Sequence, residues 1–208
     1  YQDNAMVEIP LDPQLSPNEN AQRYYKKYQK MKAAYDMAEA QLQGIRSELA
    51  YLEGQQDNLE KSTTSDELRE IREELILQGY ARPQSQGRKK GQRKLQESKP
   101  LIFASSAGRT ILVGKNNAQN DRLTMRRAQP NEMWLHTKNI PGSHVLILGE
   151  VEVDDQTLLE AAQLAAYYSK ARNSAHVHVD YTLRRHIKKP AGSVPGYVTY
   201  STNYTVYV

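Results

Sequence analysis

Mostly apolar side chains in the first third of the chain repeat at alternating steps of four and three residues. The repeat runs through Tyr24, Tyr28, Met31, Tyr35, Ala38, Leu42, Ile45, Leu49, Leu52, Gln56 and Leu59. This heptad spacing aligns them along one seam of a helix, as in a coiled coil. Ser16 and Glu19 can form a capping box with Pro17 at the first helical position, so we expect the helix to begin there. At ~1.5 Å per residue, the helix would be roughly 60 Å long.

A second, shorter helix is predicted from Asp66 to Gln78, with Ser65 as its N-cap and four glutamates that make it acidic. Its inner face is expected to consist of Leu68, Ile71 and Leu75. The two helices should form an antiparallel hairpin, but the second is too short to cover the whole seam. A helix from a missing N-terminal part, or a second chain, should cover the rest.

After residue 100 the hydrophobic period shortens toward two, the period of a β-strand. The expected strands are Leu101–Ala104, Thr110–Val113, Met133–Thr137, His144–Leu148, Ala175–Tyr181, Tyr197–Tyr200 and Tyr204–Val208. The last two should form a closing hairpin, and an amphipathic helix should run from Asp155 or Thr157 to about Ala171. The pattern predicts an α+β body with a mainly antiparallel sheet and one or two helices. The predicted parts are a helical coiled-coil arm (1–80), a linker (81–99) and the body (100–208).

The charge of these three parts differs and indicates the kind of partner. Residues 1–80 hold 9 basic and 15 acidic residues, residues 81–99 hold 7 and 1, and residues 100–208 hold 12 and 8. A basic linker and body beside an acidic arm favour a phosphate-rich partner for the second half. The sequence has no cysteine, which excludes disulfides and thiolate metal sites. No stretch approaches the ~20 apolar residues of a membrane span.

A polar loop at residues 114–121, GKNNAQND, precedes a short helix predicted for Arg122 to Ala128, which Asn120 can cap. Free N–H groups at a helix start favour phosphate oxygens. The candidates for contact with nucleic acid are Lys115, Asn116, Asn117, Asn120 and Arg122, next to the further cations Arg126 and Arg127. Alternatively, the amides hydrogen bond only with their own backbone and the loop is purely architectural.

The strand at residues 133–137 places Trp134 and His136 on one face and Leu135 on the other. A lone tryptophan is usually a core residue, whereas an exposed Trp134 could stack on a base, worth ~1–3 kcal/mol. His136 could contact phosphate, and further candidates for such contact are Lys138, Ser143 and His144. The alternative is that the turn around Pro141 needs its residues for geometry alone.

The segment RRHIKK at residues 184–189 holds four cations and is the strongest electrostatic footprint of the body. Its candidates for phosphate contact are Arg184, Arg185, Lys188 and Lys189, and the linker adds Arg88, Lys89 and Lys90. A solvated charged surface without a partner is the alternative. We expect no catalytic residue, cofactor or metal, because the histidines lack an assignable third ligand and no nucleophile has a convincing base.

Several long motifs carry a resemblance to a known family. They are SxxGxxIxVGKNNxQNDxLT, WLHxKxxPGSHV, EAAxLAAYYSKAR and VDYTLRRHIKKPxGxxPGYVxY in the body, and IPLDPxLSPxxNAQRYYKKYxKxK in the arm. They resemble the coiled-coil middle region and the NFACT-R domain of the NFACT family, which includes the bacterial fibronectin-binding protein A/RqcH group. The family's first turn is often Ser-x-Asp-Gly, whereas residues 105–108 here are Ser-Ser-Ala-Gly.

The resemblance implies the C-terminal half of a ribosome-associated quality-control factor, from a Gram-positive bacterium. Its implied partners are the large (50S) ribosomal subunit, rRNA, tRNA and the missing N-terminal half of the same protein. Full-length relatives support C-terminal alanine tailing, whereas this half alone should bind without tailing. The implied location is the cytoplasm. Some members are described as fibronectin-binding surface proteins, so an adhesin displayed on the cell surface, binding by strand addition at a sheet edge, is the rival reading.

Overall fold

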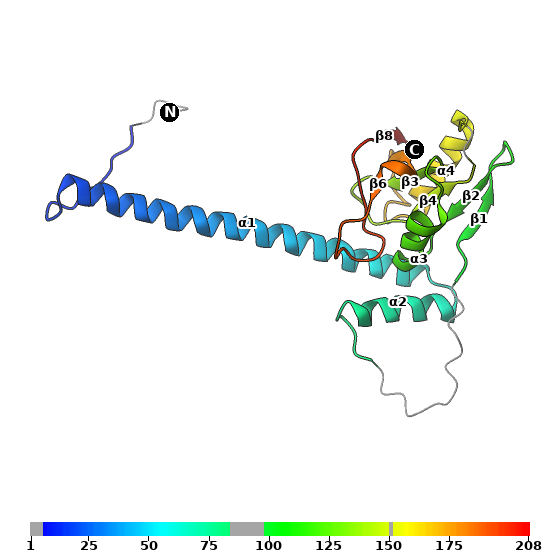
Figure 1. Ribbon diagram of the computed structural model, residues 1–208, viewed down its shortest axis with the longest axis horizontal. Coiled ribbons are helices and arrows are strands. Elements are labelled where there is room, and N and C mark those ends of the chain that lie inside the picture. Colours follow the sequence, from blue (N-terminus) through cyan, green and yellow to red (C-terminus); the bar gives the residue numbers. More distant parts are fainter. Residues whose placement is uncertain (1–5, 84–97, 150–151) are drawn as a thin grey trace. The chain divides into compact units, whose positions relative to one another are not determined.

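The computed structural model of the chain describes residues 6–83, 98–149 and 152–208 (Figure 1). It contains two compact units, Tyr1–Glu48 and Leu49–Val208, and each is described by itself. The predicted combination of a long helix with a mainly antiparallel sheet, an α+β fold, is confirmed.

The long helix α1 spans Pro17–Lys61 and begins as predicted. The Ser16 backbone N–H donates to Glu19 Oε2 at 2.8 Å, and the Glu19 N–H donates to Ser16 Oγ at 3.3 Å, so both halves of the capping box are present. In the first unit the seam is exposed: Tyr28 is 58% exposed and Tyr35 is 67% exposed. The seam therefore has no cover from the described residues of its own unit.

In the second unit the last turns of α1 lie beside helix α2, Ser65–Leu77 (Figure 1). The N-cap of α2 is Thr64 and not Ser65, because Thr64 and Glu67 form the capping box. The predicted apolar face is correct only in part, since Ile71 is buried and Leu75 half-buried. Leu68 is 46% exposed, whereas Ile71 is buried together with three glutamates of the helix. The surface that α2 contacts is polar, so the carboxylates turn inward.

The seam positions near the end of α1 differ from the prediction in the same way. Leu52 and Leu59 are exposed. Tyr51 and Gln55, on an adjacent face, are buried and hydrogen bond with Glu74 of α2. The contact between these helices is therefore largely polar and not a continuation of the heptad seam.

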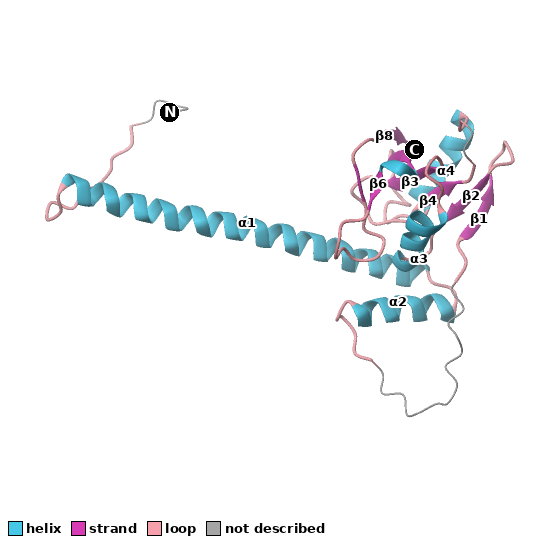
Figure 2. Ribbon diagram, viewed as in Figure 1, coloured by secondary structure: helices cyan, strands magenta, loops and turns pink. Residues whose placement is uncertain are grey.

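The body is built on a six-stranded antiparallel sheet with the strand order β1-β2-β4-β3-β5-β8 (Figure 2). Its strands are β1 Leu101–Ala104, β2 Thr110–Val113, β3 Met133–Thr137, β4 Val145–Ile147, β5 His178–Leu183 and β8 Tyr204–Tyr207. The predicted closing hairpin is wrong. Strand β8 pairs with β5, and β7 (Thr199–Tyr200) pairs with β6 (Ile187–Lys188) in a separate two-stranded sheet.

The helices of the body also correct the predicted boundaries. Helix α3 spans Asn117–Arg122 and is capped by Asn116, not Asn120, and a π-helix, η1, follows at Leu123–Arg127. Helix α4 spans Asp155–Tyr167, and a 3-10 turn, η2, spans Arg184–His186.

Alternation along the strands divides the core between the two faces of the sheet. Leu135 belongs to the cluster that packs against α4, together with Val113, Val145 and the alanines of that helix. Trp134 belongs to the opposite cluster, with Leu112, Leu123, Leu146 and Ile187. The predicted opposite orientation of Trp134 and Leu135 is thereby confirmed.

We predict that Gly114→Ala destabilises the second unit by about 2–3 kcal/mol. An added Cβ at Gly114 would lie 2.0 Å from Asn120 Oδ1, which also accepts the backbone N–H of His144. Urea unfolding followed by circular dichroism measures the change. The matched control is Gly54→Ala in α1, where the nearest atom to the new Cβ is 3.7 Å away. That substitution should stabilise by up to ~1 kcal/mol. Equal effects of the two alanines would refute this account of Gly114.

Candidate nucleic-acid interface

Four of the predicted phosphate contacts in the polar loop, Lys115, Asn116, Asn117 and Arg122, bind carboxylates of α2 instead. Lys115 Nζ lies 2.7 Å from Glu67 Oε1. The Asn116 amide donates to Glu70 Oε2 at 2.7 Å, and Arg122 Nη2 lies 3.3 Å from the other Glu70 oxygen. The charges of Lys115 and Arg122 are therefore matched within the protein. The loop donates to the carboxylate oxygens of α2 with the same groups that could bind the oxygens of a phosphate.

The other two amides of the loop are also used internally. The Asn117 side chain donates to Glu74 Oε1 at 3.3 Å. Asn120 Oδ1 accepts the backbone N–H of His144 at 3.1 Å, and its amide donates to the carbonyl of Gly142 at 3.4 Å. Asn116 and Asn120 are almost fully buried. We therefore correct their assignment from the RNA-facing surface to the architecture of the loop.

The environment of the α2 carboxylates changes their acidity. Burial raises the pKa of Glu70, but hydrogen bonds from Ser98 and Asn116 and the charge of Arg122 outweigh it, so the pKa falls below its ordinary value. The pKa of Glu67 is also lowered, since Lys115 and backbone N–H groups outweigh burial. At Glu74 burial dominates, and the pKa is raised. Glu67 and Glu70 are thus held as anions by their partners.

Trp134 is fully buried, so it is a core residue and does not offer a face to a base. Its indole N–H donates to Thr124 Oγ1 at 3.1 Å, and that hydroxyl lies 2.7 Å from His144 Nδ1. His136 stacks on the indole with a centroid distance of 5.8 Å and meets the His144 ring edge-on at 5.4 Å. Thr124, Trp134 and His144 are buried, His136 is partly buried, and the ring of Tyr200 also contacts the indole, with a centroid distance of 5.5 Å.

Burial lowers the pKa of His136 to about 4, although a backbone carbonyl at Gly142 and the charge of Asp180 favour the cation. Burial and the neighbouring His136 lower the pKa of His144 well below its ordinary value. Both rings are neutral near pH 7, so neither supplies charge to a phosphate. Ser143 is buried as well, with its backbone N–H donated to the Tyr168 carbonyl.

The remaining candidates divide between paired and exposed cations. Lys138 is exposed but lies 3.8 Å from the carboxylate of Asp180. Lys189 Nζ is paired with Asp121 at 2.6 Å. Arg184 donates from its guanidinium to backbone carbonyls of Thr124 and Ile187. Arg88, Lys89 and Lys90 lie outside the described residues.

Four exposed cations of η1, η2 and β6 have no carboxylate partner among the described residues; we call them the cation cluster. They are Arg126 and Arg127 on η1, Arg185 on η2 and Lys188 on β6. Backbone hydrogen bonds join the two segments: the N–H of Arg184 donates to the Glu132 carbonyl at 2.9 Å, and that of Arg185 donates to the Pro130 carbonyl at 3.0 Å. The cations of η1 were considered from sequence only as added charge. The contacts of residues 184 and 185 with Thr124, Pro130 and Glu132 are tertiary, and no local motif signals them.

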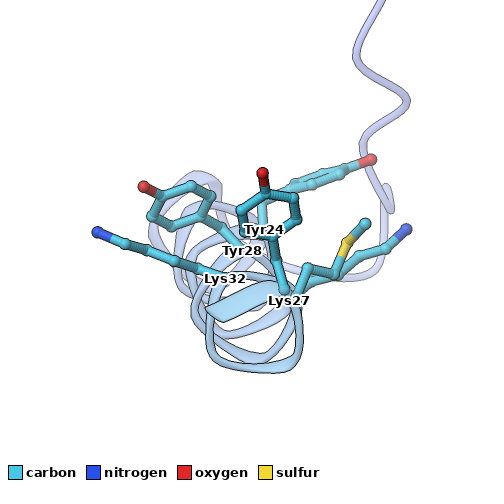
Figure 3. Close-up of a pocket in the computed structure, with 6 residues that line it drawn as sticks. Tyr24, Lys27, Tyr28 and Lys32 are labelled. Atoms are coloured by element: carbon cyan, nitrogen blue, oxygen red, sulfur yellow. The ribbon is translucent and has the colours of Figure 1, made fainter. Parts of the chain in front are cut away.

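In the first unit, α1 carries a shallow groove lined by aromatic and basic side chains. Its lining residues are Tyr24, Lys27, Tyr28, Met31, Lys32 and Tyr35. Figure 3 shows the rings of Tyr24 and Tyr28 on the same side of the helix, between Lys27 and Lys32. These residues belong to the exposed seam and its flanks.

Two kinds of site are absent from the part of the chain that the structure describes. Residues 6–83, 98–149 and 152–208 contain no group of three His, Asp or Glu side chains placed to hold a metal ion. Over the same ranges, no helix is long and apolar enough to cross a membrane.

Comparison with known proteins assigns the chain to a family. Residues 1–94 match the NFACT N-terminal and middle domains, and residues 99–200 match the NFACT protein RNA binding domain. The structure resembles the C-terminal part of the fibronectin/fibrinogen-binding protein of Streptococcus suis. The TM-score is 0.80 and the identity 41%, over 92% of this chain and 76% of that one. The chain belongs to the NFACT family.

Curated NFACT relatives are considerably longer than this chain. The Rqc2 homolog RqcH of Bacillus subtilis (strain 168) is 46% identical over 100% of this chain and 36% of its own length. The Rqc2 homolog RqcH of Streptococcus suis (strain 05ZYH33) is 42% identical over 100% of this chain and 37% of its own length. The NFACT chain described here thus spans about a third of the relatives that it matches.

In this NFACT chain, Glu70→Gln should destabilise the second unit by about 2–3 kcal/mol, because it removes the charge that Arg122 and two N–H donors neutralise. Chemical unfolding of the variant and the parent measures the difference. Glu73→Gln on the same helix is the matched control, since Glu73 is not among the buried glutamates of α2. It should change the stability by no more than about 0.5 kcal/mol. Equal losses in the two variants would disprove the role given to Glu70.

The lowered pKa of His136 predicts that the NFACT chain loses stability in mild acid. Between pH 6.5 and about 4 the unfolded chain binds a proton that folded His136 does not, so the stabilisation is complete above pH 6.5 and declines as the pH falls. The contribution amounts to roughly 2 kcal/mol between pH 7 and pH 5. Unfolding free energies at several pH values test this: His136→Gln should make the loss between pH 7 and pH 5 smaller, while His144, Glu67 and Glu70 continue to contribute to it, and parallel curves for variant and parent would contradict the role given to His136.

Proposed function

We propose that this chain is the RNA-binding part of a ribosome-associated quality-control factor. The observation that carries the proposal is the match of residues 99–200 to the NFACT RNA-binding domain. The similarity to proteins named Rqc2 homolog RqcH supports the quality-control role. The exposed cation cluster supplies the chemistry, since unpaired arginine and lysine side chains gain free energy from phosphate by releasing its condensed counterions.

The partners in this proposal are the large ribosomal subunit, through its rRNA, and tRNA. The chain binds and does not catalyse, it acts in the cytoplasm, and alanine tailing requires the N-terminal half of the full-length protein. Arg126 and Arg127 contribute with Arg185 and Lys188, because arginine forks match phosphate oxygens bidentately. Lys115, Arg122 and Lys189 have their charges matched by carboxylates and have at most a secondary part.

Substitution of the η1 arginines tests the proposal. Arg126→Ala combined with Arg127→Ala should weaken co-sedimentation with purified bacterial large ribosomal subunits about ten-fold or more near 100 mM salt. The slope of log affinity against log salt should fall by the amount that corresponds to between one and two phosphate contacts. Both side chains are exposed, so the unfolding temperature should be unchanged.

The control removes two positive charges elsewhere on the body. Lys170→Ala combined with Arg172→Ala alters exposed cations beyond α4, outside the cation cluster. This variant should sediment nearly as the parent does. Equal losses in both double variants would mean that net charge, and not the cation cluster, governs binding. If the parent did not bind the large ribosomal subunit, the proposed function would be wrong.

The alternative function is fibronectin binding, which the name of the Streptococcus suis structural relative favours. Strand β8 forms one edge of the six-stranded sheet, where a partner strand could add. The dependence of affinity on salt concentration distinguishes the two functions. Phosphate binding with six or more contacts should weaken on the order of 10³-fold from 50 to 200 mM salt, whereas strand addition depends on backbone hydrogen bonds and should change little.

A further inference from the structure

Arg184 differs from the other cations of the segment 184–189. Its Nε donates to the carbonyl of Thr124, its Nη1 lies 3.4 Å from the carbonyl of Ile187, and its side chain is half-buried. No carboxylate among the described residues pairs with it. The guanidinium therefore donates hydrogen bonds to backbone carbonyl oxygens and not to an anion.

The Thr124 carbonyl needs this donor because no N–H of η1 reaches it before the helix ends at Arg127. The Ala128 N–H closes the last turn on the Leu123 carbonyl at 2.9 Å. The next N–H, that of Gln129, donates to Glu132 Oε2 at 2.8 Å. Thr124 is fully buried, and a buried carbonyl without a donor is costly. Arg184 thus caps the end of η1 from another part of the chain.

Thr124 is itself a fixed point in the core. Its hydroxyl contacts both the Trp134 indole and the His144 ring, as described above. Arg184 therefore ties η2 to a rigid residue at the start of the π-helix that carries Arg126 and Arg127. A second side-chain contact joins η2 to the loop after η1, because Arg185 Nη1 donates to Asn131 Oδ1 at 3.0 Å.

We propose that Arg184 is a positioning residue for RNA binding. It sets the spacing between Arg126 and Arg127 on η1 and Arg185 and Lys188 on η2 and β6, without contacting RNA itself. The inference rests on the proposed function, since it concerns the same cation cluster. It reverses the ordinary reading of Arg184 as one more phosphate contact in a basic run.

Arg184→Lys tests this role because it keeps the charge and removes the fork. One ammonium on a flexible stem cannot reproduce the paired donation to the Thr124 and Ile187 carbonyls. Binding of the full chain to purified bacterial large ribosomal subunits should weaken about ten-fold. The slope of log affinity against log salt should also fall by more than one phosphate contact, although no charge is lost. Arg172→Lys, at an exposed position outside the cation cluster, should match the parent in both measurements.

A second variant guards against misfolding of Arg184→Lys. Asn131→Ala removes the partner of the Arg185 guanidinium at an exposed position, so the core stays intact. It should weaken binding about two- to three-fold, and parent-like binding by this variant would count against the proposal. Unfolding temperatures of all variants are measured alongside, and binding is assayed well below them.

The possible results separate this inference from the proposed function. Parent-like affinity and salt slope in folded Arg184→Lys would make Arg184 merely structural and overturn the inference. If Arg184→Ala lost one contact while Arg184→Lys bound normally, Arg184 would touch phosphate directly, which also overturns it. In both cases a loss in the Arg126 and Arg127 variant would leave the proposed function standing. If that variant and the parent bound equally, the proposed function itself would fail.

Discussion

The interaction between the carboxylates of α2 and the polar loop after β2 attaches α2 to the body of the second unit. Burying Glu67 and Glu70 is unfavourable unless each oxygen finds donors, and a buried carboxylate without a partner costs several kcal/mol. Lys115, Asn116 and Arg122 supply those donors. Loss of the loop would remove the cations and the amide from these carboxylates and leave them only the donors of Thr63, Thr64 and Ser98. The last turns of α1 join the same contact through Tyr51.

This constraint decides which cations remain for a nucleic acid. The loop motif has the composition of a phosphate site, yet its groups are saturated by protein carboxylates. Arg184 is similarly occupied by backbone carbonyls. Within η1, η2 and β6 the four exposed members of the cation cluster remain, and they come from segments about sixty residues apart in sequence. The cluster exists because the buried Trp134 and His144 anchor Thr124 of η1, on which η2 then docks.

Local patterns predicted the elements whose stability is local. The capping box at Ser16 and the opposite orientation of Trp134 and Leu135 depend only on neighbours in sequence. The apolar face assigned to α2 was incomplete: Ile71 is buried, but amphipathicity assumes an apolar partner, and much of the surface that α2 contacts consists of amides and cations. Proximity in sequence also suggested the closing hairpin, whereas β8 gains more by extending the sheet at β5.

The candidate site was predictable only in part, for a related reason. The exposed Arg185 and Lys188 could be chosen from the basic run, but sequence cannot say that Arg184 within it faces inward. Nor does it distinguish an amide that binds phosphate from one that binds a glutamate, since both ligands are anionic oxygens.

The two sets of charges should respond differently to salt, which separates folding from binding. Exposed cations lie within reach of counterions, whose screening length is ≈ 8 Å at physiological ionic strength. The pairs formed by Glu67 and Glu70 are largely shielded from solvent and are screened much less. Salt therefore acts mainly on the exposed cations, while α2 stays bound to the loop. A chain that divides its charges in this way can release a phosphate polymer without loosening the scaffold that orients its arginines.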